Sequence, residues 1–410
     1  IGLIRFITEK IGFLSKKEIN HYEKIEYITE KEVAAIVPAH NEELSIDYTV
    51  NALKKILPSE NIYVGSDAST DKTVKIARGL GVNVTDIWPN QGKARVLVYL
   101  LKNFRLLEKY KAVMIIDADA EIDEKYLKRA LPLFNDPTVA AVAGHGKTKW
   151  QGGWPLSWAN FFLAYRVRLW RVVQYGMRYG QTWKHTNFTY IVPGSPSIYR
   201  TWALKQIHID VPGLIIEDFN MTFELHHKKI GKIASDPGIF AVHKDPYTFK
   251  DYFKQIRRWN LGFWQTVKRH GFWPSLFFLS TILFSVELML FSIFIILIPA
   301  IVTLFFLNSF QPLTLPVLNA FSIADFSVIS RVDIWDIVLG VFMIDYLMTA
   351  IASFFEERPS LLVYGLGFFF LRYIDAFSFV YTLFLAFFIK STGLWQSPKR
   401  QVSGLKFQKV

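Results

Sequence analysis

The chain has 410 residues, of which 51% are hydrophobic, and it carries a formal net charge of +12. This length allows one large domain or two ordinary ones. The sequence has no cysteine, which excludes disulfides and thiolate metal sites. A basic charge is typical of proteins that bind nucleic acid or an anionic membrane surface. No zinc-finger, basic-zipper or RNA-recognition pattern is present, and the cationic runs 254–258 and 268–270 adjoin an apolar C-terminal part. We therefore expect a lipid bilayer as partner and no nucleic acid.

Residues 1–31 are predicted to form an amphipathic segment ahead of the first domain. The opening stretch, 1–14, is too short and too charged to cross a bilayer. It is expected either to lie at the membrane interface or to be the remainder of a transmembrane helix.

Short apolar runs alternate with amphipathic stretches from residue 32 to about residue 143. The apolar runs predict strands, and the stretches between them have helical spacing. This alternation favours an α/β domain with a parallel sheet covered by helices on both faces. Ligands bind at the carboxyl ends of the strands in such sheets. The predicted strands are 33–37 (ended by Pro38), 62–64, 82–87 and 112–116, and the predicted helices are 42–57, 73–80 and 93–104.

Two polar clusters follow the first two predicted strands, at 38–42 and 67–73. Ser, Asp and Thr are also the residues preferred where helices begin, and a helix cap explains Ser69 and Asp71. A cap explains Asp67, at the end of a buried strand, less well.

Asp117 and Asp119 follow the apolar run 113–116. Residues two apart in an extended chain point to the same side. Two carboxylates at one spot are costly unless a cation joins them, and Mg²⁺ and Mn²⁺ prefer such oxygen ligands. A divalent ion there would neutralise a leaving diphosphate. The alternative, a solvated acidic turn, fits the end of so apolar a strand less well.

Two further clusters precede the apolar part. Glu217 and Asp218 stand at the start of a predicted helix. There, a carboxylate either caps the helix or acts as a general base toward an attacking hydroxyl. Gln255, Arg258 and Trp259 lie on a predicted amphipathic helix. That helix is either a membrane anchor alone, or it presents Arg258 to a phosphate and Trp259 to a sugar or lipid.

Three stretches after residue 273 are apolar and long enough to cross a bilayer: 276–310, 334–355 and 361–389. They predict a multi-pass protein of the cell membrane with a cytoplasmic catalytic domain. Three crossings would place the basic tail, 392–410, outside, against the positive-inside tendency. A re-entrant or doubled stretch, or an exceptional tail, would resolve this conflict.

Some of the other polar residues have two possible interpretations, and some have only a structural one. The stretch 148–186 is rich in Trp and Arg and is expected either at the membrane interface or on the sheet edge. His226 and His227 are expected on a solvated helix face. Ionisable residues in or near the predicted spans either line a polar path or pair as structural contacts; they are Glu287, Asp336, Asp345, Arg372 and Asp375.

Taken in order, these motifs resemble those of the membrane-integrated, inverting family 2 glycosyltransferases, which include cellulose, chitin, hyaluronan and poly-N-acetylglucosamine synthases. The short acidic motifs are weak individually, whereas the ordered series ahead of membrane spans is specific. It covers about Val33 to Trp264. The matching elements are Pro38, Asp67-x-Ser-x-Asp71-x-Thr73, Asn90-Gln-Gly-Lys93, Asp117-x-Asp119, Gly194 to Tyr199-Arg200, Glu217-Asp218 and Gln255-x-x-Arg258-Trp259.

The resemblance implies a GT-A (Rossmann-like) α/β domain followed by transmembrane helices, a UDP-sugar donor, and Mg²⁺ or Mn²⁺. The expected bounds are 32–246 for the GT-A domain, 247–272 for the interfacial helix with Gln-x-x-Arg-Trp, and 273–391 for the transmembrane helices. The implied reaction is a single displacement that inverts the anomeric carbon.

The resemblance also implies roles for individual residues. Asp218 would be the catalytic base, with Glu217 beside it. Gln255 and Trp259 would bind the acceptor. The implied donor-binding residues, of which Asp117 and Asp119 would also be the metal ligands, are Pro38, Asp67, Lys93, Asp117, Asp119 and Arg258.

The sequence departs from the family pattern in two places. No transmembrane helix is visible ahead of the catalytic domain, which leaves open whether a polymer channel forms. Ile216 stands where many members have Thr.

The resemblance as a whole predicts a processive synthase of a β-linked polysaccharide. The alternative is a transferase that adds one sugar to a membrane lipid such as ceramide, diacylglycerol or a polyprenyl phosphate. A catalytically silent scaffold is the third hypothesis.

Overall fold

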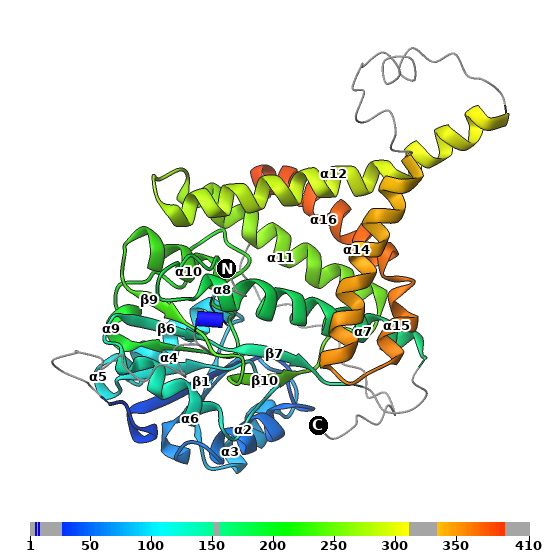
Figure 1. Ribbon diagram of the computed structural model, residues 1–410. Helices are drawn as coiled ribbons and strands as arrows, with labels where there is room; N and C mark the ends of the chain where they lie inside the picture. Colours follow the sequence, from blue (N-terminus) through cyan, green and yellow to red (C-terminus); the bar gives the residue numbers. More distant parts are fainter. Residues whose placement is uncertain (1–4, 6, 9–26, 151–155, 311–333, 390–410) are drawn as a thin grey trace.

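A seven-stranded sheet forms the centre of the N-terminal half (Figure 1). The computed structural model describes residues 5, 7–8, 27–150, 156–310 and 334–389. The strand order is β3-β2-β1-β4-β8-β6-β9, and β1 to β4 pair in parallel, as predicted. β8 is antiparallel to both of its neighbours, so the sheet is mixed. The strands are β1 (Val33–Ala39), β2 (Ile62–Asp67), β3 (Asn83–Ile87), β4 (Ala112–Ile115), β6 (Val139–Ala143), β8 (Ser197–Arg200) and β9 (Lys232–Ala234).

The prediction that Pro38 ends the first strand is wrong, because β1 continues through Pro38 to Ala39. Proline lacks an N–H and is tolerated in strands where no partner needs that donor. The pairing of β1 with β4 extends only to Ile36, whereas its pairing with β2 extends to Ala39. Pro38 therefore lies where one side of β1 has already lost its neighbour.

Helices cover both faces of this sheet, and each face has its own apolar core. Alternate residues of β1 point to opposite faces. Ala35 and Val37 join the core beneath α2, α3 and α6, and Ala34 and Ile36 join the core beneath α4, α5, α9 and α10. These helices are α2 (Ile46–Lys54), α3 (Thr73–Gly79), α4 (Lys93–Asn103), α5 (Leu106–Lys109), α6 (Tyr126–Ala130), α9 (Thr201–Leu204) and α10 (Glu217–His227).

The predicted helices agree with α3 and α4 to within a residue, whereas α2 begins four residues after the predicted start at Glu42. The backbone N–H of Glu42 donates to Thr73 Oγ1 at 2.7 Å. This contact holds Glu42 in the loop after β1, and the helix begins only beyond it.

A second, three-stranded sheet has the order β5-β10-β7. It leads the chain from the central sheet into α11 (Phe249–His270), the helix that carries the Gln-x-x-Arg-Trp motif. Its strands are β5 (Ala120–Ile122), β7 (His145–Thr148) and β10 (Phe240–His243).

α7 lies between the sheets and the C-terminal helices (Figure 1). Its apolar side chains share a core with α11, α15 and α16. The sequence left open whether this region lies at a membrane interface or on the sheet; the helix packs on β7 and on α14 and α15. The elements are α7 (Trp158–Trp170), which continues into a π-helix (Arg171–Arg178) and α8 (Tyr179–Gln181), and then α12 (Leu276–Phe310), α14 (Ile334–Phe355), α15 (Ser360–Gly365) and α16 (Phe368–Phe388).

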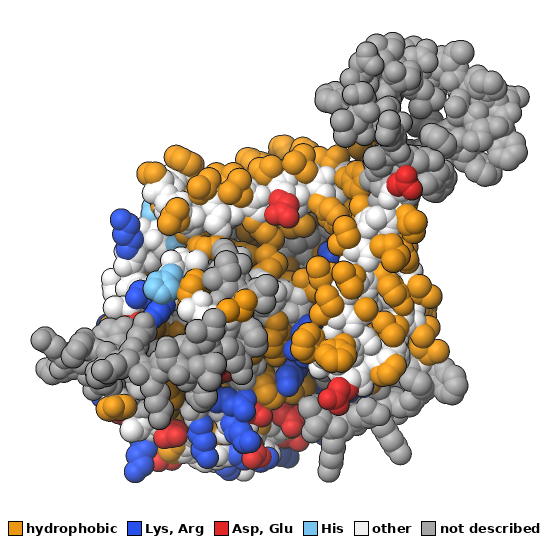
Figure 2. Space-filling model, viewed as in Figure 1, with side chains coloured by type: hydrophobic (Ala, Val, Ile, Leu, Met, Phe, Trp, Pro, Cys, Tyr) orange, Lys and Arg blue, Asp and Glu red, His pale blue; other side chains and the backbone are white. Residues whose placement is uncertain are grey.

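Three of these helices are long and apolar enough to cross a membrane. We call the segments Leu276–Ala300, Val338–Phe355 and Phe368–Phe388 the candidate spans. The third predicted stretch is divided, because the short helix α15 precedes α16. Figure 2 shows hydrophobic side chains covering α12 and α14, while charged side chains gather over the sheet half below them. Most of 1–31, the connection 311–332 and the tail 392–410 lie outside the described residues.

Ion pairs fasten α7 to the candidate spans. Arg168 Nη2 lies 3.0 Å from Asp345 Oδ1, and Arg372 Nε donates to the same oxygen at 2.9 Å. Two of the predicted intramembrane charges are thus paired with each other. A third, Asp375, accepts hydrogen bonds from Tyr165 and Tyr252.

Replacing Arg168 with Met is expected to destabilise the protein by about 1.5–3 kcal/mol, because buried Asp345 loses the charged hydrogen bonds of Arg168 and keeps only Arg372 as a cation. The side chains of Arg168 and Asp345 are 3% and 10% exposed. Arg171→Met is the matched control, because its pair with Glu356 is more open, at 17% and 28% exposed. Thermal unfolding in lipid nanodiscs measures both. An equal loss in the two variants would contradict the anchoring role of Arg168.

Candidate active site

A cleft of about 1900 Å³ lies between the strand ends of the central sheet, helices α10 and α11, and the candidate spans. A hollow beneath α12 is visible in Figure 2. Eight predicted site residues line the cleft: Lys93, Asp117, Asp119, Glu217, Asp218, Gln255, Arg258 and Trp259. Pro38 and Asp67 do not line it. The structure therefore brings together residues from four separate motifs.

Asp67 is fully buried at the end of β2. Its carboxylate accepts hydrogen bonds from the backbone N–H groups of Gln91 and Gly92, both at 2.7 Å. Both oxygens are thus engaged with the loop before α4. Gly92 has a φ of +87°, a conformation that favours glycine. Asp67 and Gly92 together fix the position from which α4, and its first residue Lys93, begins.

Lys93 is the cation at the centre of the charged cluster. Its Nζ lies 2.7 Å from Asp117 Oδ1 and 3.0 Å from Glu217 Oε1. Burial alone would lower the pKa of this ammonium, but the charges of Asp117 and Glu217 outweigh it and hold the pKa above its usual range. A Cβ at Gly194 would lie 2.9 Å from Nζ, so a larger residue there would crowd the cluster.

Glu217 and Asp218 open α10 and have different environments. Burial and the neighbouring charge of Glu217 raise the pKa of Asp218 to about 7, although Lys93 opposes this shift. Burial would also raise the pKa of Glu217, but Lys93 and Arg258 outweigh it, so that pKa is lowered. Asp218 accepts hydrogen bonds from the backbone N–H of Gly194, at 3.1 Å, and from its neighbour Phe219. Adjacent carboxyls whose pKa values are pushed apart suit a base that works near neutral pH.

Asp117 and Asp119 follow β4 and are both half-buried. Among the residues that the structure describes, no group of three His, Asp or Glu side chains lies close enough to hold a metal ion. Mg²⁺ is commonly held by one or two carboxylates, with phosphate oxygens and water as the other ligands. The pair therefore fits a divalent cation that a diphosphate helps to coordinate, and does not fit a cation held by protein alone.

Gln255, Arg258 and Trp259 lie in the middle of α11 and face the cleft. Arg258 is exposed, and its charge contributes to the lowered pKa of Glu217. The rings of Trp259 and Trp170 lie 5.7 Å apart between centroids, and both line the cleft.

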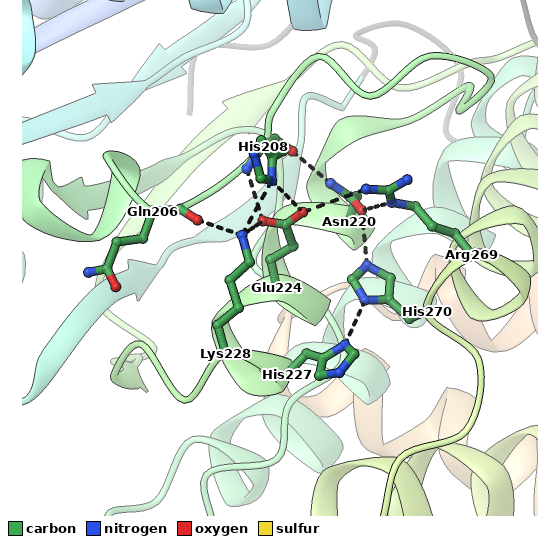
Figure 3. A network of polar contacts seen from close by, with 8 residues as sticks. All are labelled: Gln206, His208, Asn220, Glu224, His227, Lys228, Arg269 and His270. Carbon is green, nitrogen blue, oxygen red and sulfur yellow. Dashed lines mark hydrogen bonds and ion pairs between the residues drawn. The ribbon is translucent and has the colours of Figure 1, made fainter.

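A polar network joins α10 to the C-terminal end of α11 (Figure 3). Asn220 and Glu224, both buried on α10, are its centre. Asn220 Oδ1 accepts from Arg269 Nε at 3.2 Å and from His270 Nε2 at 3.0 Å. The backbone of His208 binds both central residues, because its N–H donates to Glu224 and its C=O accepts from Asn220. The helix that carries the two carboxyls is thus fixed to the helix that carries the Gln-x-x-Arg-Trp motif.

The prediction that His226 and His227 form a solvated face is wrong for His226. The His226 ring stacks on Phe277 of α12 with centroids 4.0 Å apart, and its Nε2 binds the C=O of Thr189. Burial lowers the pKa of His226 to about 4. His227 is exposed, but its ring stacks on Trp273. Phe277 of the first candidate span and Trp273, in the turn before it, thus cover these two rings.

The sequence profile of the family described as "Glycosyltransferase like family 2" matches residues 31–262, which is more than half of the chain. The chain belongs to this family. Residues 31–262 are therefore a family 2 glycosyltransferase domain, and it has the GT-A-like fold that the sequence predicted.

Two curated relatives match shorter parts of the glycosyltransferase. "Protein RfbJ" of Shigella flexneri is 35% identical over 65 residues, which are 16% of this chain and 50% of RfbJ. "Uncharacterized protein MJ1222" of Methanocaldococcus jannaschii is 36% identical over 108 residues, which are 26% of this chain and 44% of that protein. The chain spans about half the length of the curated relatives it matches.

Solved structures are similar at low identity. The mannosyltransferase PcManGT from Pyrobaculum calidifontis, in complex with GDP-Man and Mn²⁺, has a TM-score of 0.44 and 16% identity, covering 90% of this chain and 94% of its own. Glucosyl-3-phosphoglycerate synthase from Mycobacterium tuberculosis has a TM-score of 0.39 and 15% identity, covering 60% of this chain and 80% of its own. The family assignment depends on the profile match and not on these superpositions.

Sequence reasoning about the glycosyltransferase missed two buried arginines. Arg166 contacts the Gln-x-x-Arg-Trp motif from behind the cleft wall. Arg178, at the end of the π-helix, lines the cleft and donates to the C=O of Gly144 at 2.9 Å. The one available signal was the density of Arg and Trp in 148–186, which two interpretations explained equally well.

Replacing Lys93 with Met is expected to destabilise the glycosyltransferase by about 1.5–3 kcal/mol, the usual contribution of hydrogen bonds to charged groups. The substitution leaves Asp117 and Glu217 facing each other without a cation. Lys55→Met is the matched control, because the Lys55–Glu124 contact is of similar length, 2.8 Å, but its side chains are 60% and 68% exposed. The midpoint of thermal unfolding should fall for Lys93→Met and stay unchanged for Lys55→Met. Equal midpoints would show that Lys93 does not stabilise the cluster.

Proposed function

We propose that this glycosyltransferase moves a single sugar, with inversion, from a nucleoside diphosphate sugar to a lipid acceptor in the membrane. One observation carries this proposal. The cleft that contains Asp218 continues to the candidate spans, where Phe284, Leu288 and Phe291 of α12 and Phe379 of α16 form part of its wall. This end of the cleft is also lined by Glu287 of α12 and by Arg372 and Asp375 of α16. A wall of large apolar side chains with a few polar groups suits an acceptor with a polar head and an apolar tail.

The roles of the residues follow from their positions. Asp218 takes the proton from the attacking acceptor hydroxyl, since its raised pKa leaves it basic enough near neutral pH. Glu217 stays ionised beside Lys93 and keeps the pKa of Asp218 raised. Arg258, exposed at the cleft, binds donor phosphate oxygens. Asp67 acts on the donor indirectly, through the loop before Lys93.

Asp117 and Asp119 would hold a divalent cation, Mg²⁺ or Mn²⁺. When bound, this cation supplies positive charge that neutralises the diphosphate leaving group. Without the cation, Lys93 provides part of that charge at Asp117.

The processive polysaccharide synthase that the sequence favoured is the second candidate function. Trp170 and Trp259 support it, because both line the cleft and present aromatic faces on which sugar rings stack. The membrane setting is common to both candidates. We propose that the candidate spans cross the cell membrane and that the catalytic domain is cytoplasmic.

Product analysis separates the two candidates. Purified protein in nanodiscs containing ceramide, diacylglycerol or a polyprenyl phosphate receives a panel of UDP- and GDP-sugars with Mg²⁺ or Mn²⁺. A single glycolipid, lost on chelation of the metal, is the expected product. A ladder of sugar-only product would instead establish the synthase.

Asp218→Asn is expected to lower turnover by at least about a hundredfold, since general-base catalysis typically contributes 10²–10⁴-fold. Binding of the donor, measured by calorimetry, should remain within a few fold of the wild type. Asp86→Asn, which changes an exposed carboxylate on β3, is the control. Full turnover by Asp218→Asn would refute the assignment of the base.

Turnover is expected to fall as the pH drops through about 7, because the base works only when it is deprotonated. Glu217→Gln removes a charge that raises this pKa, so the acid side of the profile should move to lower pH. Nucleotide release measured from pH 5 to 9 gives both profiles. An unmoved profile in Glu217→Gln would mean that Glu217 does not set the pKa of Asp218.

A further inference from the structure

Arg166 is a buried cation in a helix that carries none of the family motifs. It lies on α7, is 1% exposed, and is among the largest fully buried side chains of the described residues. Arginine is almost never fully buried unless its charge is paired. The contacts of Arg166 therefore need an explanation.

The guanidinium of Arg166 contacts two of the three motif residues on α11. Its Nη2 donates to Gln255 Oε1. Its Cζ lies 4.7 Å from the ring centroid of Trp259, within the range of a cation–π contact. A planar guanidinium can donate a hydrogen bond from its edge and at the same time stack its face on an aromatic ring.

Asp245 extends this group across the cleft wall. Its Oδ1 lies 3.5 Å from Arg166 Nε, and its Oδ2 accepts from Thr148 Oγ1 at 2.7 Å and from Trp170 Nε1 at 3.3 Å. Arg166 thus connects both tryptophans that face the cleft to a buried carboxylate. Asp245, Trp170, Gln255 and Trp259 all line the cleft, whereas Arg166 lies behind them.

This arrangement is poor as a stabilising element. Nε and Nη1 of Arg166 are buried and form no hydrogen bond within the described part of the chain. Nε has only the 3.5 Å ion-pair contact with Asp245 and Nη1 has no partner among these residues, so burying this guanidinium costs stability. Buried polar atoms usually have hydrogen-bond partners, and exceptions to this rule are expected at functional sites.

We propose that Arg166 is a positioning residue that holds the Gln255 amide and the Trp259 ring in the orientation that binds the acceptor. This inference rests on the proposed function. We assign the acceptor to these two side chains because both line the cleft and Trp259 packs against the apolar cluster that contains Phe379 of α16. Arg166 does not touch the acceptor. It acts through Gln255 and Trp259, and the charged cluster around Lys93 forms without it.

Arg166→Met and Arg166→Lys test the proposal. Michaelis constants are measured against the mole fraction of diacylglycerol, ceramide or polyprenyl phosphate in the nanodiscs, using whichever lipid the wild type glycosylates. Arg166→Met is expected to raise the acceptor KM by about tenfold, the effect of losing one charge-assisted hydrogen bond. Donor affinity should stay within twofold. The unfolding midpoint is expected to fall, because Asp245 loses its cation, so both constants are measured at a temperature where the variant is fully folded. Arg166→Lys keeps the charge but loses the planar group that stacks on Trp259, so its acceptor KM should also lie above that of the wild type.

Arg200→Lys is the control for a purely structural arginine. Arg200 is 3% exposed and donates to the backbone C=O groups of Val139 and Phe134, away from the cleft. This variant should lower the unfolding midpoint and leave the acceptor KM unchanged.

The two proposals fail differently. If the wild type turns over but Arg166→Met keeps the acceptor KM of the wild type, the positioning role is refuted and the proposed function stands. The same holds if donor affinity and acceptor KM worsen to the same degree in the folded variant. If the wild type shows no turnover on any of these lipids, the proposed function fails and this inference fails with it.

Discussion

One cation holds the charged end of the cleft together. Lys93 lies within 3.0 Å of carboxylates from two distant segments, Asp117 after β4 and Glu217 at the start of α10. Two carboxylates in a half-buried cleft repel each other strongly unless a positive charge lies between them. Asp67 fixes the position of Lys93, because its carboxylate accepts hydrogen bonds from the backbone of the loop that precedes Lys93. Asp67, a buried acid outside the lining of the cleft, therefore helps to fix the position of the cation that joins the cleft carboxylates.

The catalytic half was predictable because its signals are local. The apolar runs around residues 33–37 and 112–116 have the length and composition of buried strands, and the structure places strands there. Parallel strands end at one edge of a sheet, so the polar clusters after the strands were expected near that edge. Lys93, Asp117 and Glu217 do meet there, whereas Asp67 lies outside the lining of the cleft. Pro38 failed as a strand end because the missing neighbour, β4, is a property of the sheet and not of the local sequence.

The contacts that join the two halves were not predictable from local patterns. Arg166 meets Gln255, and Arg168 meets Asp345, across 89 and 177 residues. His226 was predicted to face solvent because Lys228 and Lys229 follow it closely in sequence. Its burial is instead determined by Phe277 of the next helix, whose ring stacks on it. Spacing along a helix gives the direction of a side chain, but docking of another helix decides whether water or a ring covers it. The Arg-rich stretch 148–186 remained ambiguous for the same reason.

The two ends of α11 have different attachments. Near its N-terminal end, Tyr252 binds Asp375 of α16, and near its C-terminal end the polar network of Figure 3 binds α10. Residues 271–275 alone separate α11 from α12, and Phe263 and Phe277 share one apolar core across that turn. Because these two rings pack in the same cluster, a displacement of α12 also displaces the part of α11 that follows the Gln-x-x-Arg-Trp motif. The motif therefore has one rigid neighbour at each end of its helix: α16 through Asp375, and α12 through Phe277.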